Sequence, residues 1–440
     1  MSTTTLALIP LLPLLAAALT CGLQNGRRAA GVAIVAMLGS CGLALSALKE
    51  AWGMEPTDDP LTFDFEWLTV GNDTVINFGF VLDPLTGVMA AMVTFVGLLI
   101  FIYSAGYMKD DERMARFFCY LSLFAAGMLG LVLANNLLLL FMCWEIVGVA
   151  SYLLISFWFH KPEAAAAGKK AFIVTRIGDM GFLIGILLAF KTTGTLTLYN
   201  EAGSGMLQQD LTGTVFGISV AAVISLLLFM GAIGKSGQLP LHVWLPDSME
   251  GPTPISALIH AATMVTAGVY LIARTHDLFL LSPFALNTVA VIGAATLLMA
   301  AFTAITQHDI KRILAYSTIS QIGYMFLALG VGAWASSIFH LMTHAFFKAL
   351  LFLAAGAIIY SLHHEHNIFK MGGLRKKLPV AFWSFLIGSA ALAALPFTSG
   401  FYSKDAILLS AYENAWQGPL LWGIGLLGAL LTSIYSFRLV

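Results

Sequence analysis

The sequence predicts an all-α integral membrane protein with about 13 transmembrane helices. Composition is the first observation behind this fold class: 59% of the 440 residues are apolar and only 10% are charged, whereas soluble domains carry about 25% charged residues. The second is that the apolar residues form runs of about 20, the helix length that crosses a bilayer about 30 Å thick. The third is that nearly all loop Lys and Arg residues fall on one side of the predicted membrane.

The apolar runs, taken in order along the chain, predict the position of each helix. The first run, Leu6 to Leu23, follows no basic residue and has no convincing cleavage site, so we interpret it as a helix rather than a leader. The last run is still apolar at Val440, which predicts that the final helix is truncated or that a neighbouring chain continues it. The expected helices are centred near Leu14, Leu38, Phe95, Ala125, Val147, Gly181, Leu226, Val265, Ala295, Ile322, Phe347, Ile387 and Leu427.

The longest loop, from Lys49 to about Val81, predicts a small β-hairpin on an aqueous face. It contains the alternating segment TFDFEWLTV, which is typical of a strand, and the turn signal Gly71-Asn72. The loop is strongly acidic, with carboxylates at Glu50, Glu55, Asp58, Asp59, Asp64, Glu66 and Asp73.

Basic residues predict the orientation of the chain. If successive loops alternate between two sides, fourteen Lys and Arg residues face one side and three face the other. The basic side of a membrane protein is cytoplasmic, so we expect the N-terminus and the acidic hairpin to face outward. The basic side carries Arg27, Arg28, Lys109, Arg113, Arg116, Lys161, Lys169, Lys170, Lys311, Arg312, Lys370, Arg375, Lys376 and Lys377, and the opposite side carries Lys49, Lys191 and Arg274.

Net charge and cysteine content give no support for nucleic-acid binding, disulfides or a cysteine metal site. The formal net charge of −1 gives no indication of a nucleic-acid partner. The four cysteines lie in or beside apolar runs and form no CxxC pair. We interpret them as small buried hydrophobic residues and expect no disulfide or metal framework. They are Cys21, Cys41, Cys119 and Cys143.

Five ionisable side chains lie inside the apolar runs, at Glu145, Asp179, Lys235, Lys348 and Lys404. A charge at mid-membrane costs roughly 2.5–3.5 kcal/mol on insertion scales. Their presence on several separate helices predicts that the protein moves charge across the membrane. A scaffold that only anchors other subunits has no need of such residues.

Lys235 ends an apolar half-helix, which Gly237 and Pro240 then interrupt, because proline lacks an amide donor and clashes with the preceding turn. Broken helices at membrane depth line cavities, where their free backbone groups can bind ions or water. Pro254 is well placed at the start of the next helix, which carries His260 in its first turns. The alternative, a lysine that snorkels to the surface, conflicts with the apolar flanks.

His340, His344 and Lys348 recur every four residues, so they share one face of a helix. Protonatable groups in a line can pass a proton along through bridging waters, and histidine titrates near neutral pH. The preceding helix, ILAYSTISQIGYMFLALG, is rich in hydroxyls and amides. These suit the wall of a hydrated path, and equally well hydrogen bonds between helices.

Two histidine clusters have to be weighed as metal sites. The His340/His344 pair has a spacing that zinc can use, but neither an HExxH glutamate nor a third ligand is evident. The segment His363-His364-Glu365-His366 lies in a basic loop without a spaced ligand set, which favours a solvated polar loop. We therefore expect no metal site.

The two buried carboxylates predict ion pairs. Glu145 has Lys235 as its natural partner, and separating the two or adding a second cation would disturb the protonation of both, which makes an electrostatic switch. In KKAFIVTRIGDMGF, Arg176 and Asp179 are three residues apart and can pair on one helix face. For this second pair, a structural and a functional salt bridge fit the sequence equally well.

A second helix is broken by Pro396 and Gly400, just before Lys404 and Asp405. Lys235 therefore has a counterpart beside a helix break, and matched broken helices are the mark of an internal repeat in transporters. We expect N-terminal helices and the hairpin in residues 1–115, a first repeat in 116–282 and a second in 283–440.

These motifs, in this order, resemble the antiporter-like membrane subunits of proton-pumping NADH:quinone oxidoreductase (respiratory complex I), in particular the subunit L type, which is equivalent to mitochondrial subunit 5. The resemblance covers nearly the whole chain. It is carried by the segments KKAFIVTRIGDMGFLIG, GKSGQLPLHVWLPDSMEGPTPISALIHAATMVTAGVYLIARTH, DIKRILAYSTISQIGYMFLALG, FKMGGLRK and GFYSKDAILL.

The resemblance implies two inverted five-helix repeats, each with a broken helix, and proton translocation at mid-membrane. It implies that Glu145 and Lys235 form the coupling ion pair and that His260 and Lys348 lie along a hydrated axis. The terminal exchangeable group would be Lys404, with Asp405 beside it. Members of the family usually continue into further helices, including a long lateral helix.

The resemblance also implies a multi-pass protein of the bacterial inner membrane whose partners are other membrane-arm subunits and the lipid bilayer. H⁺ would be the transported ion. No redox cofactor is expected in this chain, and FMN, iron–sulfur clusters and quinone would belong to partner subunits. The alternative is a subunit of a multisubunit cation/proton antiporter, which shares the lysines and the ion pair. Met249-Glu250-Gly251 favours the respiratory type.

Overall fold

The computed structural model is helical almost throughout and divides by packing into two compact units. The first unit is Met1–Leu154 with Asp179–Met230, and the second is Ile155–Gly178 with Gly231–Val440. These units follow packing, and the repeat boundaries at residues 116 and 283 stay a prediction. The structure describes residues 3–54, 59–70, 73–200, 203–209, 211, 213–215 and 217–440, so Glu55, Asp58 and the Gly71-Asn72 turn lie outside the described residues.

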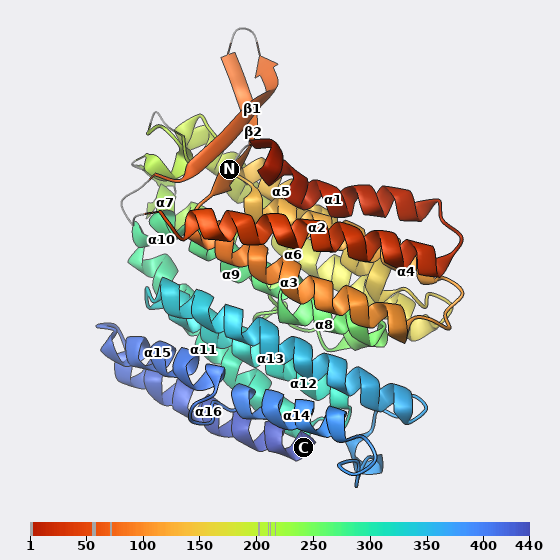
Figure 1. Ribbon diagram of the computed structural model, residues 1–440. Coiled ribbons are helices and arrows are strands. Elements are labelled where there is room, and N and C mark those ends of the chain that lie inside the picture. Colours follow the sequence, from red (N-terminus) through yellow and green to blue (C-terminus); the bar gives the residue numbers. More distant parts are fainter. Residues whose placement is uncertain are drawn as a thin grey trace. The chain divides into compact units, whose positions relative to one another are not determined.

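Long apolar helices build the first unit, and polar side chains mark where they begin. The Asn25 side chain accepts hydrogen bonds from the backbone amides of Arg27 and Arg28, and Asp83 accepts one from Thr86, which satisfies amides that lack an intrahelical partner. In Figure 1 the red and orange ribbons of α1, α2 and α3 run alongside one another. The helices are α1 (Thr3–Cys21), α2 (Gly26–Ala51), α3 (Pro84–Tyr107), α4 (Met114–Leu133), α5 (Leu137–Ile155), the second half of α6 (Pro162–Thr193) and most of α7 (Val220–Lys235).

The acidic loop forms the predicted hairpin. Strand β1 (Leu61–Val70) pairs antiparallel with β2 (Asp73–Leu82), and Asn135 fixes it to the helices because its side-chain amide donates to Asp64 at 3.1 Å. A short second hairpin, β3 (Thr214–Val215) with β4 (Ile218–Ser219), and the 3-10 turn η1 (Met206–Gln208) lie before α7. The fold class is confirmed, and among the described residues the β3–β4 hairpin is an addition to the hairpin that was predicted.

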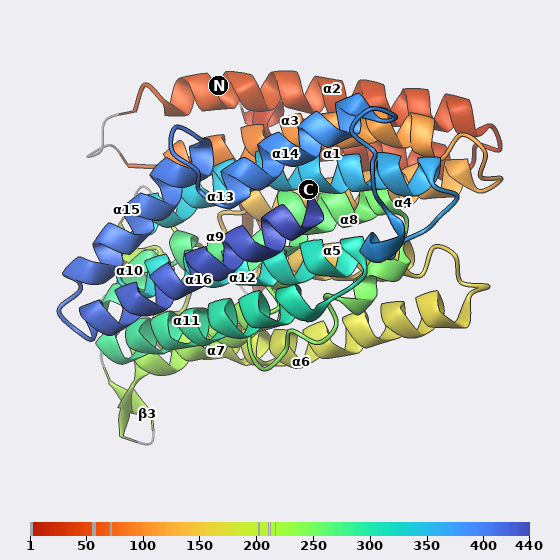
Figure 2. The same ribbon diagram turned by 90° about the horizontal axis from the view of Figure 1, so that it is seen from below.

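The second unit packs its helices around α12 and α13. Proline or a capping side chain marks several helix starts, as at Ser282-Pro283 and Asp309. Figure 2 shows α16 running along α11 and α15. Besides the first half of α6 and the end of α7, the α-helices are α8 (Thr253–Ala261), α9 (Ala267–Arg274), α10 (His276–Leu280), α11 (Pro283–Thr306), α12 (Ile310–Gly330), α13 (Trp334–Ser361), α14 (Pro379–Leu392), α15 (Ser399–Glu413) and α16 (Gly418–Leu439). The 3-10 turns are η2 (Asp247–Glu250), η3 (Met264–Thr266) and η4 (Ile368–Lys370).

Both predicted helix breaks are present. Helix α7 ends at Lys235, and the next α-helix begins at Thr253 with Pro254 in its first turn. Helix α14 ends at Leu392, and α15, which carries Lys404, begins at Ser399. A third break, which the sequence did not indicate, separates α8 from α9 directly after His260 and Ala261.

The expected membrane spans correspond to helices. Within the part of the chain that the structure describes, eleven helices or helix pairs are long and apolar enough to cross a bilayer, and Val220–Lys235 and Pro379–Leu392 are shorter apolar helices. Each predicted centre falls in one of these segments, with Val265 in the turn between α8 and α9. The predicted number of about 13 counts the two shorter helices as spans.

Helices α11 and α12 approach each other through glycine, which lets backbones come close where lipid provides no hydrophobic drive for association. A Cβ on Gly323 would lie 2.8 Å from the carbonyl oxygen of Gly293, and one on Gly293 would lie 2.6 Å from the Leu327 amide nitrogen.

We expect Gly323→Ala to lower the free energy of unfolding by about 1–3 kcal/mol, measured by thermal unfolding in detergent. Gly31→Ala on α2, where nothing lies within 4 Å, is the matched control and should be neutral or stabilising; equal effects would contradict close packing.

Candidate functional site

A line of buried protonatable side chains runs through the second unit. It is drawn from the end of α8, from α13 and from the helix after the second break, and each member is at most 1% exposed. Such groups are expensive in an apolar interior unless they are hydrogen-bonded or functional. The members are His260, His340, His344, Lys348 and Lys404.

The three groups on α13 lie on one face, as predicted, and each contacts a different helix segment. The ring centroids of His340 and His344 are 6.5 Å apart. His340 shares a hydrogen bond of 2.8 Å with the Ser403 hydroxyl of α15. His344 donates through Nδ1 to the Ala261 carbonyl of α8 at 3.2 Å. The amine of Lys348 donates to the Ser317 hydroxyl of α12, so this stripe connects α8, α12 and α15.

His260 lies in the last turn of α8, beside the stripe on α13. Its Nε2 and the Ser248 hydroxyl form a hydrogen bond of 3.1 Å, and its ring stacks on Phe352 of α13 with 5.7 Å between centroids. The next residue, Ala261, is the carbonyl that His344 contacts. The break after α8 thus places a histidine and an accepting carbonyl against α13, where they contact Phe352 and His344.

Lys404 fills the second helix break. Its amine donates to the Leu392 carbonyl at 2.6 Å, and Leu392 is the last residue of α14, where carbonyls lack an intrahelical partner. The amine also lies 5.2 Å from the Tyr324 ring centroid, and Tyr324 in turn donates its hydroxyl to the Gly425 carbonyl at 2.6 Å. The neighbouring Asp405 is exposed.

The two buried carboxylates belong to the first unit. Asp179 accepts a hydrogen bond of 2.6 Å from the indole of Trp144, and both carboxylate oxygens of Glu145 are shielded from solvent. Their predicted partners, Arg176 and Lys235, belong to the second unit, so both pairings stay predictions. Lys235 is 1% exposed, and the Arg176 guanidinium lies 4.8 Å from the Phe172 ring centroid.

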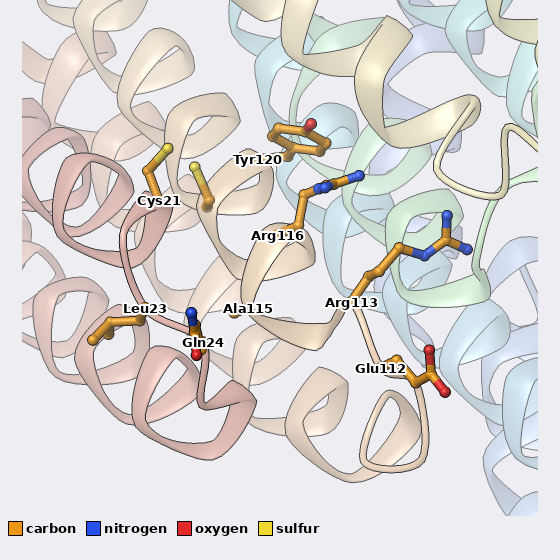
Figure 3. A pocket seen from close by; sticks show the side chains of 9 residues that line it. Cys21, Leu23, Gln24, Glu112, Arg113, Ala115, Arg116 and Tyr120 are labelled. Atoms are coloured by element: carbon orange, nitrogen blue, oxygen red, sulfur yellow. The ribbon is translucent and has the colours of Figure 1, made fainter.

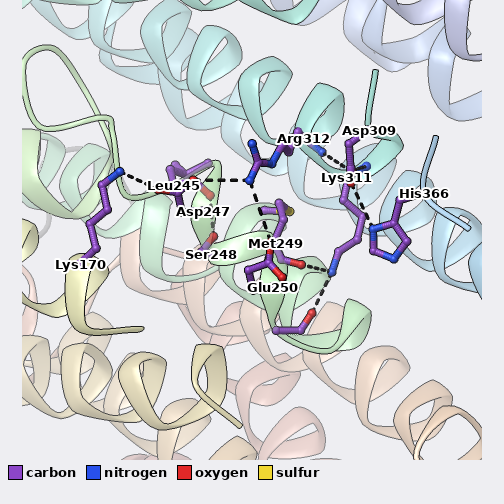
Figure 4. Close-up of polar contacts among 11 residues, drawn as sticks. Lys170, Leu245, Asp247, Ser248, Met249, Glu250, Asp309, Lys311, Arg312 and His366 are labelled. Carbon is purple, nitrogen blue, oxygen red and sulfur yellow. Dashed lines mark hydrogen bonds and ion pairs between the residues drawn. The ribbon is translucent and has the colours of Figure 1, made fainter. Parts of the chain in front are cut away.

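An ionic cluster surrounds the turn η2 at one end of the second unit (Figure 4). Asp247 binds Lys170 at 2.6 Å and Arg312 at 3.7 Å, and Arg312 also lies 4.0 Å from Glu250. These exposed pairs contribute little stability individually. They hold the segment between α7 and α8 against the start of α12, and so fix the position from which α8 and His260 begin.

Lys311 is the buried amine that the sequence did not single out. It was expected only as a loop cation, but it is 2% exposed and donates to the carbonyls of Met249 and, at 2.8 Å, Gly251. The one available signal was the free carbonyls expected where Gly251 and Pro252 interrupt the helix. The Lys311 amine occupies those acceptors, as Lys404 does at the other break.

The Asp309 side chain caps the start of α12 and also contacts the loop after α13. Its carboxylate accepts hydrogen bonds from the amides of Lys311 and Arg312 at 2.8 and 3.0 Å and lies 3.1 Å from His366 Nδ1. Burial raises the pKa of Asp309, but the hydrogen bonds from His366 and Arg312 outweigh it and bring the pKa below its usual value. In the same loop Glu365 pairs with Lys370 at 3.2 Å, so His366 and Glu365 have local partners.

We expect Asp309→Ala to lower the free energy of unfolding by about 0.5–2 kcal/mol at neutral pH, because α12 loses its cap. A carboxylate whose pKa is lowered by folding stabilises above its unfolded pKa of about 3.9, and that stability is lost as pH falls through the lower folded value. Thermal unfolding of wild type and variant should therefore converge toward acid pH. Asp309→Asn keeps a capping oxygen and should cost less at pH 7; a deficit in Asp309→Ala that does not change with pH would contradict the role of the charge.

Comparison with known proteins identifies the family. Residues 134–432 match the model described as "NADH:quinone oxidoreductase/Mrp antiporter, TM". The chain belongs to this NADH:quinone oxidoreductase/Mrp antiporter family. Residues 67–118 match a second model, "NADH-Ubiquinone oxidoreductase (complex I), chain 5 N-terminus", and the predicted resemblance to complex I antiporter-like subunits is confirmed.

Relatives within the NADH:quinone oxidoreductase/Mrp antiporter family match nearly the whole chain. NADH-quinone oxidoreductase subunit L of Escherichia coli is 50% identical over 444 residues, covering 99% of this chain and 70% of the relative. Subunit L of Pseudomonas aeruginosa is 52% identical over 425 residues, covering 95% and 68%. The chain thus spans about two thirds of these relatives.

Solved structures share the fold. A chain of the Mrp complex from Dietzia sp. DQ12-45-1b superimposes with a TM-score of 0.84 at 31% identity, over 99% of this chain and 46% of that chain. A chain of the membrane-bound sulfane sulfur reductase, an archaeal respiratory membrane complex, gives a TM-score of 0.83 at 23% identity, over 100% and 87%, and this likeness supports the fold alone.

Proposed function

We propose that the chain is a proton-translocating membrane subunit of a complex I-type NADH:quinone oxidoreductase, and that the buried line of the second unit is its proton path. The subunit L relatives support the parent complex. The observation that carries the path is that five buried protonatable groups lie on or beside broken helices and bridge α8, α12, α13 and α15.

The hydrogen bonds of the three histidines suit proton transfer. In each histidine, one ring nitrogen is hydrogen-bonded to a protein atom. The other ring nitrogen is buried and has no protein partner among the described residues. Buried polar atoms are nearly always hydrogen-bonded, so these nitrogens are positioned to bind water and exchange a proton with it. The available atoms are Nδ1 of His260 and Nε2 of His340 and His344.

Lys404 would then set one end of the path, and Lys348 would lie within it. Among the described residues, Lys404 and Lys348 donate to neutral acceptors, a carbonyl and a hydroxyl, and a neutral amine can keep either contact. A proton can therefore enter or leave without breaking the packing. The lysine and histidine composition favours H⁺ over Na⁺, because sodium and other hard cations prefer oxygen ligands.

Coupling would begin at Glu145 and Lys235. Opening or closing this ion pair would change the field along the path, and Arg176 with Asp179 offers a second pair on α6. No step of NADH oxidation or quinone reduction is assigned to this chain: FMN, iron–sulfur clusters and quinone would lie in partner subunits, which the subunit would contact within the membrane arm. We place it in the bacterial inner membrane with the basic loops, and the ionic cluster around η2, in the cytoplasm.

The second candidate is a subunit of a multisubunit cation/proton antiporter, favoured by the structural match to the Mrp complex. Vesicles that contain the assembled parent complex separate the two. We expect proton movement that requires NADH and quinone and persists without sodium. Proton movement driven by an imposed sodium gradient, without NADH, would establish the antiporter and overturn the respiratory assignment.

A further inference from the structure

The first unit contains a cavity whose lining includes none of the residues of the proposed proton path. It lies between the end of α1 and the beginning of α4 and has a volume of about 460 Å³. Figure 3 shows Cys21, Arg116 and Tyr120 around the same opening. Cys119, Arg113 and Gln24 also line it.

Two thiols meet at this cavity. Cys21 is the last residue of α1 and is exposed, and Cys119, in the second turn of α4, is half-buried. The Cys119 thiol interacts with the Cys21 thiol and with Thr20, and both cysteines line the same cavity. The expectation that all four cysteines are small buried hydrophobic residues is right for Cys41 and Cys143 but wrong for this pair.

The packing of α1 against α4 keeps the two thiols close to each other. The Thr20 hydroxyl also donates to the Ala16 carbonyl at 2.7 Å, which anchors the last turn of α1, and α1 packs along α4. A disulfide requires the two sulfurs to come within about 2.05 Å of each other. Because the two thiols already interact across packed helices, rotation of their side chains is the movement that brings the sulfurs together.

We propose that Cys21 and Cys119 form a redox-active dithiol, which hydroperoxides convert into an intramolecular disulfide between α1 and α4. The thiolate of Cys21 attacks the peroxide oxygen, so that the O–O bond breaks, the peroxide is reduced to an alcohol or water, and Cys21 becomes a sulfenic acid. The sulfur of Cys119 then attacks the Cys21 sulfur and releases water.

The surroundings suit this chemistry. The exposure of Cys21 admits the oxidant, and the half-buried Cys119 is the resolving thiol. Arg113, Arg116 and Glu112 give the cavity polar walls, which a small polar oxidant can enter. On the proposed orientation this face is cytoplasmic, where disulfides are usually transient and redox-sensing. Both thiols are free in the present structure.

The test uses the assembled complex in native membranes, treated with hydrogen peroxide and then with an alkylating reagent. After digestion without reductant, mass spectrometry should detect a peptide joining Cys21 to Cys119 that disappears on treatment with dithiothreitol. Alkylation after unfolding should find Cys41 and Cys143 still as thiols. If the linked peptide is missing while Cys119 is alkylated in the folded complex and Cys21 is oxidised alone, the proposal is overturned.

Two variants isolate the order of events. In Cys119→Ser the sulfenic acid on Cys21 has no resolving thiol, so dimedone should label Cys21 several-fold more than in wild type. Cys41→Ser, at a buried position away from the cavity, is the matched control and should leave the linked peptide at its wild-type level. Equal dimedone labelling of wild type and Cys119→Ser would show that Cys119 does not resolve Cys21.

Discussion

Replacing Lys348 by methionine is expected to lower NADH-driven proton pumping by about 10²-fold or more, the usual effect of removing a group that transfers a proton. Methionine fills nearly the same volume, so the packing of α13 against α12 is retained. The Ser317 hydroxyl still donates to the Leu314 carbonyl in the variant. Removing the lysine therefore leaves neither an unpaired charge nor an unsatisfied donor at this position.

The measurement is proton uptake by vesicles that hold the assembled complex, with NADH oxidation followed in the same sample. Lys370→Met is the matched control, because the Lys370 side chain is 67% exposed and pairs only with Glu365 among the described residues. We expect the control to pump as wild type. Full pumping by an assembled Lys348→Met complex would show that the stripe on α13 is structural.

The sequence was sufficient to predict the helices and two of the three breaks, because both signals are local. A run of about 20 apolar residues is the length of a span, and Pro240 and Pro396 interrupt a helix through their own covalent structure. The stripe on α13 followed from the spacing of four. These features need no knowledge of what packs against them.

The third break could not be read in the same way. Residues Ala261 to Ala267 contain neither proline nor glycine, yet Thr263 adopts φ −130° and ψ −103°. Its hydroxyl donates to the Leu258 carbonyl, which replaces helical bonding there. A threonine inside a helix commonly bonds to the carbonyl three or four residues before it without breaking the helix, whereas this bond reaches five residues back. Packing therefore decides where the helix breaks.

The hydrogen-bond acceptors of the buried lysine amines also could not be predicted from the sequence. Ser317, the Leu392 carbonyl and the Gly251 carbonyl are distant along the chain from Lys348, Lys404 and Lys311, and no periodicity marks them. The Cys21–Cys119 contact was missed for the same reason: it depends on how the end of α1 meets α4, whereas composition reports only that both cysteines border apolar runs.

Glu145→Gln and Lys235→Met are each expected to reduce pumping by about 10-fold or more, equivalent to about 1.4 kcal/mol or more in barrier. If the two side chains pair, Lys235→Met leaves a carboxylate without its cation. Breaking a buried pair from one side costs about 3–5 kcal/mol, while replacing both members can be neutral. The double variant should therefore recover thermal stability and assembly that each single variant loses.

Pumping should not recover with stability, because a neutral pair cannot switch the field along the path. This separation of the two readouts is what distinguishes a coupling pair from a structural salt bridge. Lys161→Met with Glu163→Gln, at exposed positions on the loop before α6 and in its first turn, provides the matched control and should change neither readout. If the double variant pumps as wild type, the pair is structural and coupling must begin elsewhere. If stability losses of the single variants simply add, Glu145 and Lys235 do not pair.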